Sequence, residues 1–442
     1  MGIFGALIYM CLASMSIYDA EETALANNPQ IKKAEELLEK AKQGRVETIS
    51  KWLPQLSFLS QAFKTQEPLR LRNLNKPSAF LTQLSLIQNL FSLPLYYNVK
   101  IASLVTAQFE NMLAAAQNDV LYQTRLLYYL VALGHQKVLT AKENIDLLEN
   151  LAKRMEGKYQ IGESTSYNVN QAKVAIANVT DSYYSAMAQL KGHQDELAEV
   201  LGYDPSEERP VFDQKIIPIR DIPELVCKID ASKEFFHSLE ISSLFPPEEF
   251  EMWNQIAEAN RPDIQITQTL LSMTQEAVKS RTSEYLPTLQ LMAGYGGAST
   301  PFIEQPSTRF DNQLMQWAVG LSLQLNIFDG FGRESRIKQS KSERAAVQFE
   351  AKKVLQSAHT EVREQIYKME KGLAKYLTAS ANLSLAEETL AQAKSRLDIG
   401  YNTIYEYLIS VDGLIRAKTA VDEGKFELIA AYYGLLHACG RK

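Results

Sequence analysis

Residues able to do acid–base, nucleophilic or metal chemistry are few in this chain and are not clustered. The 442-residue sequence contains five histidines, none within four residues of another: His135, His193, His237, His359 and His437. No HExxH pair is present, so the spacing that places two imidazoles around zinc on one helix face is missing. The sequence therefore predicts no catalytic residue, no metal ligand and no cofactor, and we interpret the chain as a non-enzyme.

The cysteines and a glycine-rich stretch add no stronger signal. Cys11, Cys227 and Cys439 form neither a CxxC pair nor a zinc spacing, and the pairing of Cys227 with Cys439 stays open. The stretch GYGG, residues 294–297, lacks the lysine of a phosphate loop and fits the end of a strand better. The formal net charge of −6 supplies no basic field for a nucleic acid. No nucleic acid partner is expected.

Two parts of the chain share landmarks, which indicates a tandem duplication with a period near 235 residues. The segment NNPQIKKAEELLEKAKQGRVETISKWLPQLSF from Asn27 aligns with NRPDIQITQTLLSMTQEAVKSRTSEYLPTLQL from Asn260, an offset of 233. Further on, LSLIQNLF from Leu84 aligns with LSLQLNIF from Leu321, and KYQIG aligns with RLDIG at an offset of 238. The matched prolines and glycines are residues that commonly mark turns and the ends of helices and strands. Chance similarity between helical segments is the alternative interpretation.

Each copy predicts a helix followed by two strands. The helices, residues 30–51 and 263–284, end at Leu-Pro because proline disfavours helix in the residue before it. Large apolar side chains alternate with small or polar ones from Trp317 to Ile327, and more weakly over 289–296, 56–58 and 84–86. The intervening segments 64–79 and 299–312 contain proline, asparagine and charges, and are expected to be exposed loops. The pattern predicts four strands with one apolar face.

A sharp turn and a very long helix follow the last strand. Within LNIFDGFGRES, Asp329 and Gly330 are expected to turn the chain and Gly332 to relax the backbone before a helix begins. Between Gly332 and Gly400 lie 67 residues without proline, roughly 100 Å of helix. Apolar residues recur every seven positions from 362 to 397, as in a coiled coil. Such a helix must project away from any membrane.

The predicted sheet cannot be sealed by one chain. Four strands with an apolar face leave two open edges, and backbone groups at an edge find no water in lipid. Three copies would supply twelve strands, an even number within the range of outer-membrane barrels. The alternative is a soluble coiled-coil scaffold or structural protein whose short strands form a dimerisation sheet.

The combined order of motifs resembles the outer membrane efflux protein family, the TolC-like channels. The resemblance covers nearly the whole chain and is carried by NNP at position 27 with LPQL at 53, NRPDI at 260 with LPTL at 286, LSLQLNIFDGFGR at 321 and DIGYNTIYEYL at 398. It implies an α+β membrane protein, internally duplicated, in which a long α-helical barrel is continuous with a transmembrane β-barrel. Each protomer would contribute four strands and each trimer twelve.

The resemblance also implies a function, a location and partners. The protein would be a homotrimeric exit duct in outer membrane lipid, extending into the periplasm, for efflux or type I secretion. A periplasmic adaptor (membrane fusion) protein and an inner-membrane efflux pump or ABC exporter would deliver the substrates. The cargo, the pump and the way the gate opens are not specified by the sequence.

The chain divides into four expected segments. Residues 1–16 are expected to form a signal peptide, although no Lys or Arg precedes Lys32, and lipidation at Cys11 is an alternative. Residues 17–201 are the first repeat and 261–442 the second. The segment 202–260 is rich in proline and acidic residues, and the resemblance implies that it connects the repeats as part of a belt around the helical barrel.

The resemblance assigns roles to the two helix tips. Gly162 and Gly400 would reverse the chain at the periplasmic end, and with Tyr401 would contact the adaptor. Glu406 matches the acidic position that commonly lines the closed entrance, where a threefold ring of carboxylates would attract cations.

The other gate positions depart from the family pattern. Asn168, at the matching place in the first tip, is neutral, and Asn402 replaces a basic residue that some members use to tie the tips. Ile409 stands where a second acid often lies. Glu406 as an ordinary solvated helix residue therefore remains the alternative to a gate.

Overall fold

The computed structural model describes residues 15–71, 74–203, 247–299 and 316–441. The expected signal peptide lies outside these residues except for its last two positions. Most of the expected connector, including Cys227, and residues 300–312 of a predicted loop also lie outside them. The chain forms two compact units. The first contains residues 1–35, 112–264 and 354–442, and the second contains residues 36–111 and 265–353.

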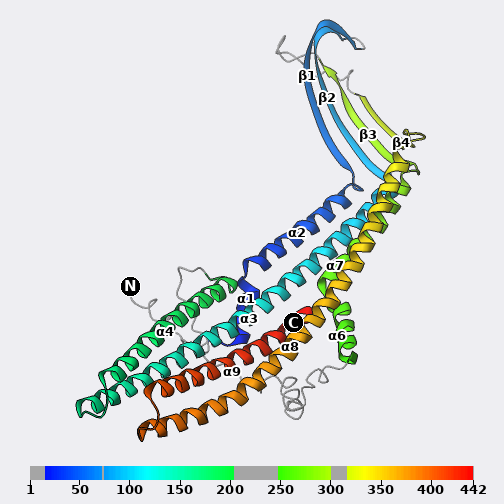
Figure 1. Ribbon diagram of the computed structural model, residues 1–442. Helices are drawn as coiled ribbons and strands as arrows, with labels where there is room; N and C mark the ends of the chain where they lie inside the picture. The colour runs from blue at the N-terminus through cyan, green and yellow to red at the C-terminus, as the bar shows by residue number, and fades with distance from the viewer. Residues whose placement is uncertain (1–14, 72–73, 204–246, 300–315, 442) are drawn as a thin grey trace, which may run out of the picture. The chain divides into compact units, whose positions relative to one another are not determined.

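The elements follow the same order in both halves of the sequence (Figure 1). The first half contains α1 (Ile17–Asn27), α2 (Pro29–Ser50), β1 (Gln55–Leu71), β2 (Leu74–Phe91), α3 (Leu93–Gln160) and α4 (Ser166–Val200). The second contains α6 (Pro247–Asn260), α7 (Pro262–Ser283), β3 (Thr288–Ser299), β4 (Gln316–Gln324), α8 (Gly332–Asp398) and α9 (Ile404–Ala438). The matched helices have 22 and 22, 68 and 67, and 35 and 35 residues. The long helices expected from the sequence are confirmed.

Both halves also contain the same contact between a left-handed glycine and an asparagine carbonyl. Gly202 follows α4 with φ of 80°, and a Cβ placed on it would lie 2.7 Å from the backbone oxygen of Asn27. Gly440 follows α9 with φ of 67°, and its Cβ would lie 2.7 Å from the backbone oxygen of Asn260. A glycine satisfies both the positive φ and the close approach without strain. The two halves therefore share a tertiary contact as well as an order of elements.

The alternation pattern predicted four strands, and these form one antiparallel sheet in the order β1-β2-β3-β4. The ladder pairs Leu56 with Leu86, Leu84 with Tyr295 and Leu291 with Leu321. Along β4, the side chains of Trp317, Val319, Leu321 and Leu323 are 64–76% exposed. The apolar face of this sheet is therefore uncovered in a single chain.

The strands differ in length from the sequence prediction. Residues 64–79 were expected to form a loop, but β1 continues to Leu71 and β2 begins at Leu74. The register shifts between Lys64 and Leu69, and Pro68 and Pro77 both fall in this interruption. Because a bulge leaves residues unpaired, it accommodates prolines that cannot donate to the ladder.

The last strand is shorter than the alternation suggested. It was expected to reach Ile327, but β4 ends at Gln324, which pairs with Thr288. The residue before Thr288 is Pro287, which has no backbone N–H, so the ladder has no donor with which to continue. Residues 325–329 are irregular.

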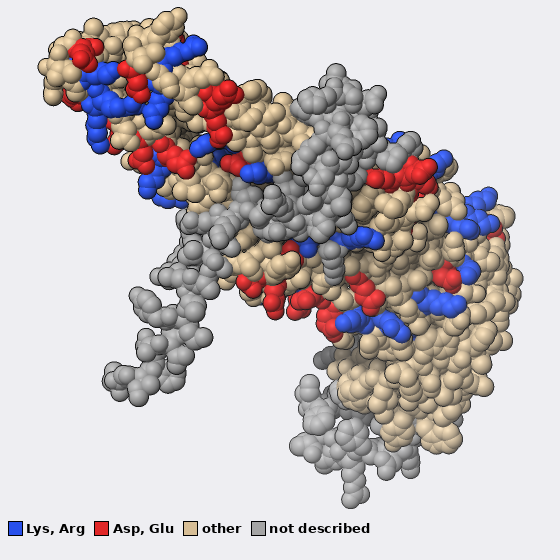
Figure 2. Space-filling view, turned by 90° about the horizontal axis from the view of Figure 1, so that it is seen from below, with Lys and Arg blue, Asp and Glu red and all other residues tan. Residues whose placement is uncertain are grey.

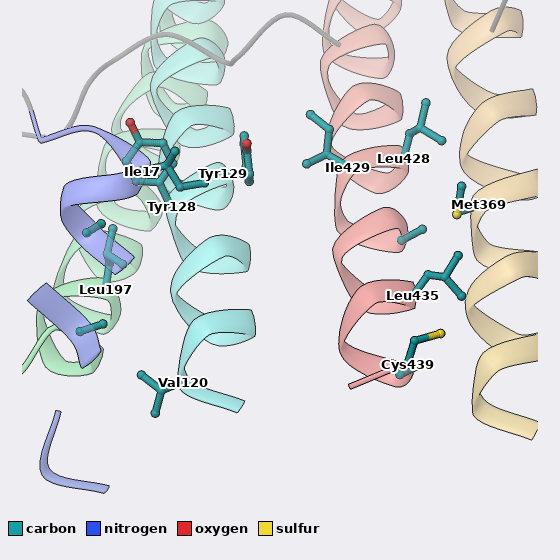
Figure 3. Packing of buried hydrophobic residues seen from close by; sticks show 14 of the residues in the cluster. Ile17, Val120, Tyr128, Tyr129, Leu197, Met369, Leu428, Ile429, Leu435 and Cys439 are labelled. Atoms are coloured by element: carbon teal, nitrogen blue, oxygen red, sulfur yellow. The ribbon is translucent and has the colours of Figure 1, made fainter. Parts of the chain in front are cut away.

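The core of the first unit lies between the long helices. Val362, Ile366, Met369 and Leu373 of α8 are at most 4% exposed, which confirms the predicted apolar stripe. Figure 3 shows Met369 of α8 and Leu428 of α9 pointing toward one another. None of the described helices is both long and apolar enough to cross a membrane.

Candidate functional site

The two helix tips of the first unit are the candidate site. α3 and α4 are joined through residues 161–165, and α8 and α9 through residues 399–403. Gly162 has φ of 80° and Gly400 has φ of 76°, values that favour glycine. A Cβ at either position would meet nothing within 4 Å, so backbone conformation rather than space makes glycine suitable. The structure thus places both predicted glycines in the turns that reverse the chain.

Glu406 lies at the start of α9 and takes part in its N-terminal cap. The Thr403 hydroxyl accepts a hydrogen bond from the Glu406 backbone N–H at 3.3 Å, and Glu406 Oε2 accepts one from the Thr403 backbone N–H at 2.9 Å. These reciprocal bonds form a capping box. The sequence signal was present, since Thr403 and Glu406 have the T-x-x-E spacing, but the sequence reasoning missed it.

The other gate candidates have local partners. Thr165 caps α4 in the first tip, and its hydroxyl accepts from the Asn168 backbone N–H at 3.4 Å. The Asn168 side-chain amide donates to the Ser164 hydroxyl at 3.2 Å. Asn402 is half-buried, and its backbone N–H donates to the carbonyl oxygen of Arg396 at 3.3 Å. Asn402 and Glu406 therefore belong to one tip and Asn168 to the other.

Exposed apolar side chains surround both turns. Ile161 is 69% exposed in the first tip, and Ile399 and Tyr401 are 79% and 78% exposed in the second. The Arg396 guanidinium lies 6.0 Å from the centre of the Tyr401 ring. Adjacent large apolar side chains that remain in water commonly mark a protein contact surface.

A buried apolar cluster joins the two hairpins near their tips. Its members come from all four helices: Leu148, Leu151, Ala152 and Met155 of α3, Val169 and Ala172 of α4, Ala393 and Leu397 of α8, and Ile404, Tyr407 and Val411 of α9. Burial raises the pKa of the Tyr407 phenol above its ordinary value. The two tips are therefore held together mainly by apolar packing.

Ion pairs also connect the first hairpin to the second. Arg154 of α3 lies 3.3 Å from Asp398, Glu143 of α3 lies 3.1 Å from Lys418, and Lys137 of α3 lies 2.8 Å from Glu423. A hydrogen bond from Lys137 lowers the pKa of the Glu423 carboxyl despite its partial burial. The sequence reasoning missed these pairs because their partners lie more than 240 positions apart and no local pattern links them.

A groove of about 450 Å³ lies between α4 and α9 close to the tips. Its apolar lining includes Tyr167 and Val174 of α4 and Tyr405 and Ile409 of α9, all more than half exposed. Asp412 lies at the same groove and pairs with Arg416 at 2.9 Å. Ile409 adds an exposed apolar side chain to this surface.

The turn between β4 and α8 lies in the second unit. Gly330 and Phe331 both have positive φ, 68° and 66°, and α8 begins at Gly332. Gly332 was expected to relax the backbone before the helix, but it does not take the left-handed conformation. Phe331, the residue before it, does so instead. A Cβ on Gly332 would lie 3.0 Å from Asp329 Oδ2, so Gly332 matters for its small size. Asp329 Oδ1 accepts from the Arg333 backbone N–H at 3.3 Å.

No group of three potential metal-binding side chains lies together among the described residues. Figure 2 shows acidic and basic side chains interspersed on the face that it presents. The tips contain two tight turns, exposed apolar side chains and ion pairs between helices.

Comparisons with known proteins relate this arrangement to channels. Residues 253–410 match the family model described as outer membrane efflux protein. Outer membrane efflux protein BepC of Brucella suis is 21% identical over 337 residues, which cover 76% of this chain and 66% of the length of BepC.

The chain also shares its fold with solved outer-membrane channels. One match is CusC, whose structures concern folding and transmembrane channel formation. It has a TM-score of 0.77 and 14% identity, over 97% of this chain and 93% of CusC. The outer membrane protein VceC of Vibrio cholerae matches with a TM-score of 0.75 and 16% identity over 96% of each chain.

Proposed function

We propose that this chain is an outer membrane efflux protein and serves as a passive exit duct of the outer membrane, because residues 253–410 match the model of that family and the fold matches that of solved outer-membrane channels. Substrates for efflux or type I secretion would be delivered to it from the periplasmic side. The protein itself supplies a wall and a gate, and energy comes from an inner-membrane pump.

The observation that carries this proposal is the uncovered apolar face of an open sheet. Four large side chains of β4 are 64–76% exposed, and β1 and β4 are the edge strands of the described sheet. In lipid an exposed apolar face is favourable, but unpaired edges are not. Pairing of β1 with β4 of the next copy would satisfy both edges, and three copies would give a twelve-stranded barrel. A homotrimer is therefore the proposed assembly.

The exposed surface of the helix tips supports the proposal that they bind a periplasmic adaptor (membrane fusion) protein. Gly162 and Gly400 form tight turns, and Tyr401 stands exposed beside one of them. Docking of an adaptor on the tips would bury this apolar surface and connect the duct to an efflux pump or ABC exporter. In the closed duct, Glu406 would contribute one carboxylate per subunit to a ring that favours cations.

The soluble coiled-coil scaffold explains the sheet less well. A soluble protein would leave Trp317, Val319 and Leu321 in water on one continuous face, unless a partner covered them. The helices alone fit either interpretation.

Two measurements test the proposed duct. The protein should fractionate with the outer membrane as a heat-modifiable oligomer, and the purified oligomer should conduct ions in planar bilayers. Recovery of the full chain in the soluble fraction, or a monomer without conductance after gentle extraction, would show that the proposal is wrong.

A further inference from the structure

A groove of about 410 Å³ runs between α2 and α3 within the second compact unit. One wall carries Arg45 and Thr48 of α2 and Lys51, the residue directly after α2. The three residues recur at a spacing of three along the chain. Ile101 and Val105 of α3 form an apolar side of the same groove. No carboxylate is among the described residues that line it. The groove is therefore cationic and partly apolar.

The polar groups of the groove are mostly hydrogen-bond donors. The Asn98 side-chain oxygen accepts from the Ser280 hydroxyl at 3.1 Å, which leaves the amide NH₂ group as a donor. The side chains of Arg45 and Lys51 have no carboxylate partner within the described parts of the chain. Two cations and an amide donor without a counter-charge suit a bound anion.

At the matching positions in the second half of the chain, the cations do have carboxylate partners. At the offset of 233, Lys51 corresponds to Glu284 and Thr48 to Arg281. Glu284 pairs with Arg281 at 3.0 Å and with Arg336 at 2.8 Å. The second half thus neutralises its charges internally, whereas the first half presents cations that its own fold does not use.

A hydrogen bond connects the residue directly after α2 to the end of β2. The Asn89 side-chain amide of β2 donates to the backbone oxygen of Lys51 at 2.7 Å. On α3 the Tyr96 ring is 47% exposed, and Lys100 Nζ lies 4.9 Å from its centre. Exposed tyrosine and lysine are typical of a membrane interface. Arg45 lies six residues before Lys51, about 9 Å at the rise of an α-helix.

We propose that this groove binds the phosphate headgroup of an anionic phospholipid, held by Arg45, Lys51 and Asn98 while its acyl chains extend toward the sheet. The inference rests on the proposed function, because it requires the sheet to lie in the membrane. Gly44, on the same wall, has nothing within 4 Å of its Cβ position, so the groove is open to a ligand there.

The test is retention of lipid by the purified oligomer in detergent, measured by native mass spectrometry. Phosphatidylglycerol should be retained in preference to phosphatidylcholine. Arg45→Gln and Lys51→Gln should each weaken phosphatidylglycerol binding about fivefold, as expected for one cation near a phosphate. Gly44→Leu should also weaken it, because this side chain fills the groove without changing the charge.

Lys40→Gln is the matched control, since Lys40 is an exposed lysine of α2 that does not line the groove. Its lipid retention should equal that of the unmodified protein. Equal retention of the two lipids, unchanged binding in the Arg45 and Lys51 variants, or an equal loss in the Lys40 variant would overturn the inference. Competition by inorganic phosphate at concentrations similar to those of the lipid would also overturn it, because the occupant would then be the free anion.

Conductance of the same preparations separates this inference from the proposed function. An oligomer that conducts ions but does not distinguish the two lipids contradicts the headgroup site alone. An unmodified protein that forms no conducting oligomer contradicts the duct itself.

Discussion

Arg261 shows how one residue links three helices of the first unit. Its guanidinium donates to Asp263 at 2.8 Å, to Glu361 at 2.7 Å and to the carbonyl oxygen of Ala438 at 3.0 Å. Asn28 at the matched position of the first half donates to the equivalent carbonyl, that of Val200, at 2.7 Å. The same contact is therefore neutral in one half and charged in the other.

Removal of Arg261 should destabilise the protein more than removal of Asn28. Arg261→Ala leaves two carboxylates without their cation and a carbonyl without its donor, which should cost about 2 kcal/mol. Asn28→Ala removes a neutral hydrogen bond and should cost about 1 kcal/mol. Thermal denaturation of the oligomer followed by circular dichroism compares them. Equal losses would show that the charges around Arg261 contribute nothing.

The loss caused by Arg261→Ala should depend on pH. Burial alone would raise the pKa of the Asp263 carboxyl, but hydrogen bonds from Arg261 outweigh it and hold that pKa below its ordinary value. A lowered folded pKa gives stability that is present above the unfolded value, about 3.9, and is lost as pH falls through the folded value. The difference in melting temperature should therefore shrink below about pH 4. A difference that stays constant down to pH 2 would contradict this assignment.

Glu406 allows its two roles to be tested separately. Glutamine at the third position of a helix can complete a capping box as glutamate does, so Glu406→Gln should keep the cap while it removes the charge. If the carboxylates line the pore, single-channel recordings in a salt gradient should show a reversal potential shifted toward lower cation selectivity. An unchanged reversal potential would mean that Glu406 serves the helix end alone.

At the scale of elements, close helix contacts depend on particular glycines. A Cβ on Gly424 of α9 would lie 2.9 Å from the Cα of Tyr376 on α8, whereas a Cβ on Gly413 would meet nothing within 4 Å. Both glycines lie inside the same helix. The pair therefore separates helix packing from helix propensity.

Alanine at these two positions should have opposite effects on stability. Gly424→Ala should destabilise by about 1–3 kcal/mol, because backbone atoms of α8 must move to accept the methyl group. Gly413→Ala should stabilise by up to about 1 kcal/mol, since alanine loses less entropy in a helix. Melting temperatures of both variants decide this. Stabilisation by both substitutions would mean that α8 and α9 are not held as closely as the structure shows.

At the scale of the whole molecule, the proposed barrel needs strands from other copies of the chain. Lysine on the lipid-facing side of a barrel costs about 2–4 kcal/mol at mid-membrane, whereas the side facing the lumen tolerates charge. Leu321 is 66% exposed on the apolar face, and Ser322 lies on the opposite face.

Lysine substitutions at these neighbouring positions should therefore have different effects on the amount of oligomer that inserts into the membrane. Leu321→Lys should strongly reduce the amount of membrane-inserted oligomer, and Ser322→Lys should leave it nearly unchanged. Heat-modifiable bands on gels of outer-membrane fractions measure both. If the two lysines have equal effects, the apolar face does not contact lipid.

The sequence by itself determined the types of elements and their order. Alternation of apolar residues predicted the four strands, absence of proline predicted α8, and Gly162 and Gly400 marked the turns, because these signals depend on local backbone preferences. The spacing of Thr403 and Glu406 was equally local and could have been read as a cap.

The tertiary structure decided which distant residues meet and where pairing stops. The hairpin of β1 and β2 extends through Pro68 and Pro77 because a bulge absorbs both, and β4 ends where Pro287 leaves its partner without a donor. Arg154 and Asp398 pair across 244 positions, and Gly440 reaches the backbone of Asn260. These contacts depend on how the helices converge in space, which no local pattern of residues specifies.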